Sequence, residues 1–179
     1  PTYTKTSLQT ARVALSSYTS GLSETDPGVF SVTAVPPDVP TLGTSSVTIT
    51  GVAPTYDNTI ANTAIALVTS TIVEANNFID SSEDVELASA KLAEVQATAN
   101  DAQLRMQNEL NEFNQANVLY QSTVQRDIQN AGLLDANESR ELQKYVNEIS
   151  EYQATVNAEI QEKTVKMQQY QMLYTQLKA

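Results

Sequence analysis

Carboxylates are the only side chains in this 179-residue chain whose type and spacing suit catalysis or metal binding. Several glutamates stand three residues apart, which puts both members of a pair on one face of a helix. The pairs are Glu109 with Glu112, Glu138 with Glu141, and Glu148 with Glu151. Such pairs hold divalent cations in helical bundles, but those sites also use Glu-x-x-His sequences.

The chain has no histidine and no cysteine, so it lacks the commonest general base, thiolate nucleophiles and the commonest transition-metal ligands. Neither a glycine-rich phosphate loop nor an aspartate-rich calcium loop occurs in the sequence. Glu83, Asp84 and Glu86 gather where a helix is expected to begin, and carboxylates there favour the helix dipole. We therefore interpret the acids as solvated helix faces, and expect no enzyme activity, no cofactor, no metal and no small-molecule substrate.

The net charge of −11 is unevenly distributed, with −1 on residues 1–56 and −10 on residues 57–179. A negative surface repels phosphate backbones, so we expect no direct contact with nucleic acid. A basic surface on a partner protein is the better electrostatic match.

The beginning of the sequence is polar and shows no signal peptide. The longest uncharged apolar stretch, residues 59–73, is interrupted by Asn and Thr and is shorter than the roughly 20 residues needed to cross a bilayer. We therefore expect neither a membrane segment nor secretion through a signal peptide.

Residues 55–179 contain no proline and a single glycine, and apolar residues recur there every three or four positions. This periodicity predicts an all-α fold of long amphipathic helices. A short helix is expected over residues 4–20 and another over 57–78, where Asp57 or Asn58 can cap the first turn.

Two longer apolar seams follow, with the steps of three and four residues that are typical of coiled coils. A two-helix hairpin has little core of its own, so we expect copies of the chain to cover these seams. The predicted contacts between copies are Leu92, Val95, Met106, Leu110, Phe113, Tyr120, Val124, Ile128, Leu142, Tyr145, Ile149, Tyr152, Val156, Ile160, Met167, Tyr170 and Tyr174.

A helix break separates the two seams. Gly132 suits a left-handed C-terminal cap, and Asp135 with Glu138 forms a D-x-x-E helix start. The flanking helices would then cover residues 87–131 and 136–178. Their matched lengths favour an antiparallel hairpin, and one unbroken rod is the alternative.

Residues 22–56 differ in composition, with five prolines and three glycines. Proline disfavours helix both at its own position and at the residue before it. We predict an extended attachment arm, with β-type composition at 29–32 and 46–50 that allows one small hairpin; a disordered linker is the alternative. The division expected is residues 1–56 and 57–179. The side chains predicted to dock on another protein are Val29, Phe30, Val32, Val35, Val39, Val47 and Ile49.

The helical part contains an internal echo. Tyr120-Gln-Ser-Thr-Val-Gln-Arg-Asp-Ile-Gln129 matches Tyr152-Gln-Ala-Thr-Val-Asn-Ala-Glu-Ile-Gln161 at an offset of 32 residues. Thirty-two residues is close to nine helical turns, so equivalent side chains return to one face. The echo is either a duplicated docking surface or convergence on favourable amphipathic sequence.

Residues 85–179 resemble the Gln- and Tyr-rich helical virion proteins of tailed bacteriophages, especially marine ones. The resemblance is carried by Tyr120-Gln-Ser-Thr-Val-Gln125, by residues 145–161 and by Met167-Gln-Gln-Tyr-Gln171. It implies a multicopy structural component of the capsid surface, neck or tail, present in the virion and in contact with itself and with other virion proteins.

Two other functions are compatible with the sequence. The first is an acidic helical adaptor that presents a docking face to a basic partner. The second is a component of a flagellin-like secreted filament, which the chain resembles in its cysteine-free, Ser/Thr/Asn/Gln-rich helices.

Overall fold

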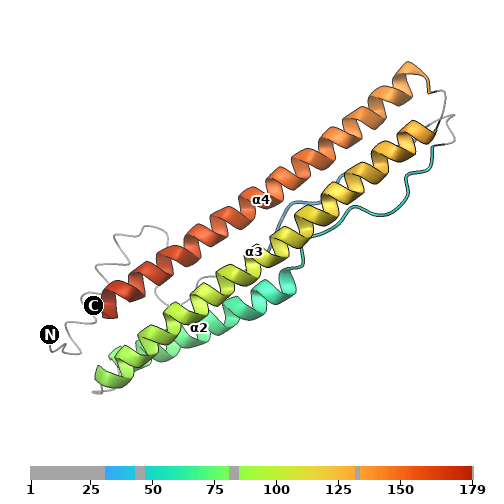
Figure 1. Cartoon of the computed structure of the whole chain (residues 1–179). Helices are drawn as coiled ribbons and strands as arrows, with labels where there is room; N and C mark the ends of the chain where they lie inside the picture. The colour runs from blue at the N-terminus through green and yellow to red at the C-terminus, as the bar shows by residue number, and fades with distance from the viewer. Residues whose placement is uncertain (1–30, 43–46, 81–84, 132–133, 179) are drawn as a thin grey trace. The chain divides into compact units, whose positions relative to one another are not determined.

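A computed structural model describes residues 31–42, 47–80, 85–131 and 134–178. Over these ranges the chain forms three α-helices and no strand: α2 (Asn58–Asp80), α3 (Val85–Asn130) and α4 (Ala136–Lys178) (Figure 1). The all-α prediction is therefore confirmed. The expected helix over 4–20 lies outside the described residues, as do Val29, Phe30 and Gly132.

The contacts divide the described chain into two units, and α3 and α4 each contribute to both. Unit 1 contains α2, residues 85–107 of α3 and residues 161–178 of α4. Unit 2 contains residues 108–130 of α3, residues 136–160 of α4, and the segment before α2. The boundary expected at residue 56 falls between this segment and α2, which belong to different units.

Aspartates begin two of the helices. Asp57 Oδ1 accepts a hydrogen bond from Thr59 N at 2.8 Å, and Asp135 Oδ1 accepts one from Glu138 N at 2.8 Å. Each carboxylate thus satisfies an N–H group that has no partner within its own helix. The hydrogen bonds from Thr59 lower the pKa of Asp57 below its ordinary value. The sequence-based starts of α2 and α4 are correct to within one residue.

In unit 2, α3 and α4 run antiparallel and form a hairpin, because α3 ends at Asn130 and α4 begins at Ala136 (Figure 1). Rings and amides join the two helices: Phe113 meets Tyr152 edge to face at 5.5 Å, and Asn117 Nδ2 donates to Gln153 Oε1 at 2.8 Å. Of the two alternatives, the structure has the hairpin and not the unbroken rod.

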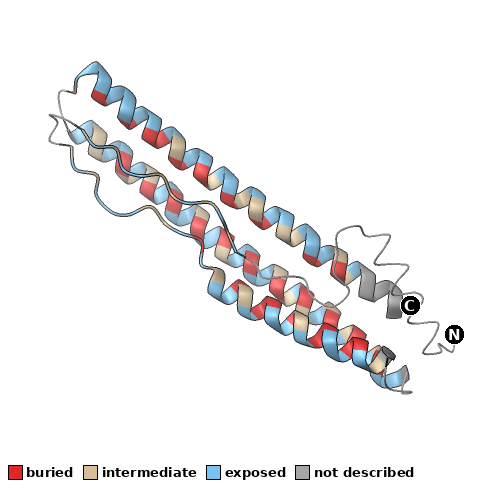
Figure 2. Ribbon diagram, turned by 180° about the vertical axis from the view of Figure 1, so that it is seen from behind, coloured by how far each residue is buried: buried red, intermediate tan, exposed pale blue. Residues whose placement is uncertain are grey.

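Buried residues form a stripe along each helix (Figure 2). The residues predicted to join copies of the chain lie in these stripes and are buried within the single chain, apart from two. Ile128 is half-buried, and the side chain of Tyr174 lies outside the described residues. The single chain thus already shelters these seam side chains, and the prediction that they join copies of the chain stays a prediction.

In unit 1, α2 buries one face against its neighbours: Ala61, Ile65, Val68, Ile72 and Ala75 are at most 3% exposed. Polar contacts flank this core. The hydroxyls of Thr71 and Thr98 lie 3.0 Å apart, and Lys91 Nζ lies 2.6 Å from Glu74 Oε2. The bonds to Glu74 and Glu94 raise the pKa of Lys91 above its ordinary value. These contacts fix how α2 packs on α3.

Residues 31–42 and 47–56, called the arm below, form neither helix nor strand. In unit 2 the arm follows the hairpin along its length (Figure 1). The predicted β-hairpin does not form in the described part of the arm, although residues 29, 30 and 46 lie outside it. None of the described helices is long and apolar enough to span a bilayer.

We predict that Asp135→Ala lowers the free energy of unfolding by about 1 kcal/mol, because Glu138 N–H loses its acceptor. Asp135→Asn is the matched control, since asparagine caps helices about as well as aspartate. Urea denaturation followed by circular dichroism measures both variants. Equal losses for Ala and Asn would contradict the assigned cap.

Candidate protein-interaction sites

The acidic residues considered for catalysis do not converge in the structure. No group of three or more acids among the described residues is arranged to hold a metal ion. Glu112, Glu141 and Glu151 are exposed, and Glu83 and Asp84 lie outside the described ranges. Two surfaces of the described residues combine apolar side chains with polar groups, a groove lined by α2 and α3 and the face of the hairpin that contacts the arm.

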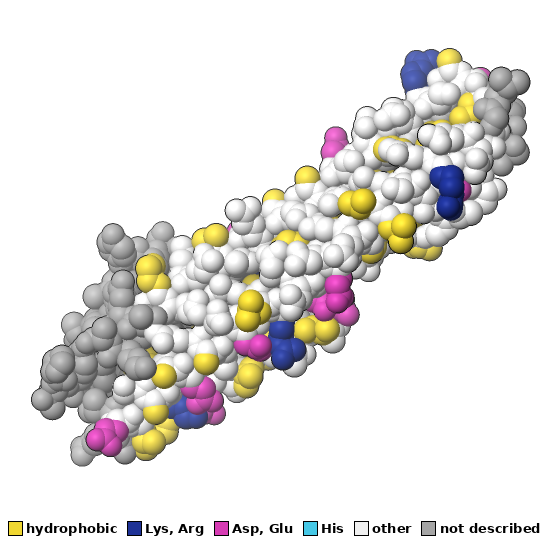
Figure 3. Space-filling view, viewed as in Figure 1, with side chains coloured by type: hydrophobic (Ala, Val, Ile, Leu, Met, Phe, Trp, Pro, Cys, Tyr) yellow, Lys and Arg dark blue, Asp and Glu magenta, His cyan; other side chains and the backbone are white. Residues whose placement is uncertain are grey.

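The first surface is a groove in unit 1 between α2 and α3, with a volume of about 550 Å³. On the face drawn in Figure 3, hydrophobic side chains gather over α2 and the adjoining part of α3, with charged groups among them. Ile60 and Leu67 are 40% and 52% exposed, although each is a large apolar residue.

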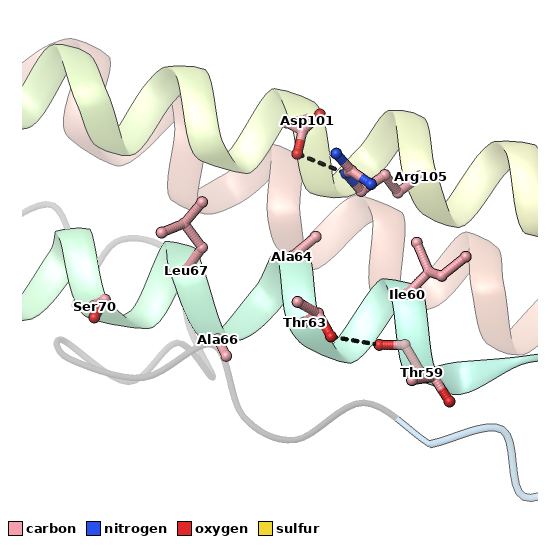
Figure 4. A pocket seen from close by; sticks show the side chains of 9 residues that line it. All are labelled: Thr59, Ile60, Thr63, Ala64, Ala66, Leu67, Ser70, Asp101 and Arg105. Atoms are coloured by element: carbon pink, nitrogen blue, oxygen red, sulfur yellow. Dashed lines mark hydrogen bonds and ion pairs between the residues drawn. The ribbon is translucent and has the colours of Figure 1, made fainter.

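The groove is lined by side chains of both helices. Ile60, Ala64 and Leu67 project from α2 on the side toward α3 (Figure 4). Across from them, Arg105 Nε and Asp101 Oδ2 form an ion pair at 2.8 Å. The α2 side of the groove therefore combines apolar side chains with the hydroxyls of Thr59, Thr63 and Ser70, and α3 contributes the ion pair as a polar rim.

The second surface is the face of unit 2 that binds the arm. Asp127 Oδ2 accepts hydrogen bonds from Thr50 N at 2.8 Å and Thr50 Oγ1 at 2.7 Å. Glu159 likewise accepts from Thr33, through its N–H at 3.2 Å and through its hydroxyl, and from Ala34 N at 3.3 Å. Two carboxylates, one on each helix, therefore hold the arm by main-chain N–H groups as well as by threonine hydroxyls.

An apolar cluster lies between these two attachment points. It consists of Tyr120, Val124, Tyr145, Val146 and Ile149, and the partly buried Ile49, Ala53 and Ile128 pack against it. Gly51 has a φ of +83°, a backbone conformation that residues with a side chain rarely adopt, and a Cβ added there would lie 3.8 Å from the Tyr120 ring. The arm thus covers apolar surface that the helices leave open.

The tyrosines of this face have different partners. Tyr120 and Tyr145 share a hydrogen bond between their hydroxyls at 2.5 Å, whereas Tyr152 donates to the carbonyl of Pro54 at 3.0 Å. Burial, and then the bond to Tyr120, raises the pKa of Tyr145 well above its ordinary value. Burial, and then the charge of Glu159, raises the pKa of Tyr152. The raised pKa values keep both hydroxyls protonated at physiological pH, so Tyr152 retains the proton that it donates to Pro54.

Amides take the place of apolar contacts in another part of unit 2. Asn114 and Asn157 exchange hydrogen bonds at 3.1 and 2.8 Å, and Gln153 Nε2 donates to Asn114 Oδ1 at 3.2 Å. Asn117 is fully buried, and its Oδ1 has no partner among the described residues. An unpaired buried oxygen costs about 1–3 kcal/mol, so this layer favours a specific helix pairing at some expense in stability.

The predicted docking arm is placed only in part. Val32, Val47 and Ile49 are half-buried, and Val35 and Val39 point into solvent. The sequence reasoning missed Thr33, Thr50 and their two carboxylates. A signal was present, because Asp127 and Glu159 occupy the same position in the two segments of the echo.

Comparison with known proteins gives no further guidance: no family model, no curated protein and no solved structure matches the chain.

We predict an acid-sensitive contact at Asp127. The hydrogen bonds from Thr50, first its N–H and then its hydroxyl, lower the pKa of Asp127 below the ordinary value of 3.8. Arg126 adds to this effect. A lowered pKa means that the bond to Thr50 is fully present above pH 3.8 and is lost as the pH falls through the folded-state pKa.

Nuclear magnetic resonance titration of the Asp127 carboxyl carbon measures this pKa. Thr50→Val removes the hydroxyl donor and should move the pKa part of the way back toward 3.8. Thr48→Val, at an exposed position two residues away, should leave it unchanged. A carboxyl that titrates at its ordinary pKa in the unmodified chain would contradict the contact.

We also predict that Gly51→Ala loosens the arm by about 1 kcal/mol, because alanine disfavours positive φ. The added methyl group would meet the Tyr120 ring at 3.8 Å, an ordinary contact, so the effect is conformational and not steric. Amide hydrogen exchange over residues 47–56 should quicken about fivefold. Val52→Ala, at a site 88% exposed, is the control, and equal exchange in both variants would contradict the assignment.

Proposed function

We propose that this protein is a non-enzymatic structural component of a tailed-phage virion, which acts by binding copies of itself and other virion proteins. The observation that carries the proposal is the α2–α3 groove, where Ile60 and Leu67 remain exposed beside a polar rim. Exposed apolar patches rimmed by polar groups are characteristic of protein-binding surfaces. The resemblance of residues 85–179 to phage virion proteins supplies the class.

The groove replaces the helix seams as the proposed contact surface. The seam side chains are sheltered within one chain, so they offer little area to a partner. The groove offers apolar side chains that are already in water, and burying these gains about 25 cal/mol per Å² of apolar surface.

A second function is supported by the charge distribution. Residues 57–179 carry −10, and the exposed acids of the helices attract a basic protein surface. In this alternative the chain is an adaptor that stays monomeric until a basic partner binds.

We predict that Leu67→Asp weakens self-association at least tenfold, because a carboxylate in the groove must be desolvated when the surface is buried. Val73→Asp is the matched control, since Val73 is also an exposed residue of α2 but does not line the groove. Analytical ultracentrifugation of the full chain measures both variants.

Quantitative mass spectrometry of purified phage particles then tests the virion assignment, with many copies per particle as the expected result. A chain that is monomeric at all concentrations and absent from particles would refute the structural role. A monomer that assembles only with a basic protein would favour the adaptor.

A further inference from the structure

The internal echo becomes a pseudo-two-fold arrangement in unit 2. The offset of 32 residues makes Phe113 equivalent to Tyr145 and Tyr120 equivalent to Tyr152. In the structure Phe113 contacts Tyr152, and Tyr120 contacts Tyr145. Exchanging the two copies of the repeat converts one aromatic pair into the other, as expected when identical surfaces meet about a two-fold axis.

Burial follows the same correspondence. Leu110 and Leu142 are both buried, and so are Val124 and Val156. Even the polar Asn117 is as fully buried as its equivalent, Ile149. The two copies therefore hold equivalent places in the hairpin, which favours a duplicated surface over chance similarity.

The carboxylates that bind the arm obey this relation too. Asp127 and Glu159 are equivalent residues of the repeat. Each accepts hydrogen bonds from both the main-chain nitrogen and the hydroxyl of one threonine, Thr50 or Thr33 respectively. The hairpin thus presents two equivalent threonine sites.

The arm contains its own repeat, which supplies these threonines. Val32-Thr33-Ala34-Val35 matches Ile49-Thr50-Gly51-Val52 at an offset of 17 residues. The first residue of each motif is half-buried, and the last is 78% exposed in one motif and 88% in the other. Two copies of a short peptide motif therefore bind two copies of a helical surface through the same atoms.

The correspondence departs from identity beside the sites, and the reasons are visible. Gly51 has a positive φ, and no described residue other than glycine does. The backbone at Ala34, the equivalent position of the other motif, therefore has a different conformation. Phe113 has no hydroxyl, which leaves the Tyr152 hydroxyl to bond Pro54, whereas Tyr120 pairs with Tyr145. The threonine contacts themselves are common to both sites.

We propose that unit 2 carries duplicate binding sites for one extended peptide motif, a β-branched apolar residue followed by Thr, Ala or Gly, and Val, and that the outside partner is the arm of a second copy. An arm that leaves its own site meets an equivalent site on another copy and re-forms the same hydrogen bonds. Reciprocal exchange therefore loses no contact and closes a symmetric dimer.

The competition within one chain sets the conditions for this exchange. A tethered arm has an effective concentration in the millimolar range, so exchange is favoured where copies are crowded, as in an assembly. The choice of a second copy as the partner rests on the proposed function as a multicopy structural component. The binding of the motif to two sites does not depend on that function.

The first experiment counts the sites with a synthetic peptide of residues 47–55. The host is the full chain with Thr33→Pro and Thr50→Pro, since proline removes the N–H donor and the hydroxyl of each threonine and so weakens the chain's own arm as a competitor at both sites. Titration calorimetry should give two peptides per chain, and a peptide of residues 31–38 should compete with the first.

Asp127→Ala or Glu159→Ala in this host removes the acceptor and should reduce the stoichiometry to one, and the two together should abolish binding. A peptide with Thr50→Ala should bind at least tenfold more weakly. Circular dichroism confirms that the helices of each variant are intact. The proposal would be overturned if the peptide did not bind the host, or if it bound at only one site while Asp127 and Glu159 were both present. It would also be overturned if the peptide bound equally well after both carboxylates were replaced.

The second experiment tests the partner by mixing differently tagged copies of the otherwise unmodified chain at high concentration. Mixed assemblies should form, should disappear in the Asp127→Ala/Glu159→Ala variant, and should persist in Leu67→Asp, which changes only the groove. If the peptide occupied two sites but differently tagged copies never formed mixed assemblies, the arm of a second copy would not be the partner. Because Leu67→Asp separates the groove from the arm sites, failure of one proposal is distinguishable from failure of the other.

Discussion

Each long helix carries an apolar stripe that must be removed from water, and the rest of the structure depends on how that stripe is covered. In unit 2 the two helices cover each other along Val124, Val156 and the aromatic pairs, and the arm adds Ile49 and Ala53 over what remains. In unit 1 the additional cover is α2, whose own Val68 and Ile72 are completely buried against its neighbours. A single chain thereby provides the cover that two helices alone could not.

The arm raises a second requirement, because a segment without helix or strand must find acceptors for its own N–H groups. Asp127 and Glu159 provide them from half-buried positions on the two helices of the hairpin. Acids that serve solubility elsewhere on the helices thus serve as attachment points here. The arm is therefore held on the hairpin by side-chain acceptors, without a sheet ladder in its described part.

Much of the helical architecture was predictable from local rules. The start of α4 follows from Asp135, whose side chain caps the first turn, and the buried stripes follow from apolar spacing, as Leu92, Val95 and Met106 show. What the spacing could not reveal was the identity of the surface that covers each stripe. The prediction of contacts between copies assumed that Pro- and Gly-rich residues before α2 reach outward, whereas Ile49 and Thr50 fold back on the hairpin of their own chain.

The amino-acid sequence by itself determined that the chain is helical, where α2 and α4 begin, and which face of each helix is apolar, because these properties depend on neighbours within about one turn. It also contained the repeat at an offset of 32 residues, but as a pattern without a geometry. Only the tertiary structure decided that the two copies of the repeat meet antiparallel, and that Asp127 and Glu159 each receive a threonine. Those contacts join residues 77 and 126 positions apart, and no local periodicity specifies which distant segment will supply a donor.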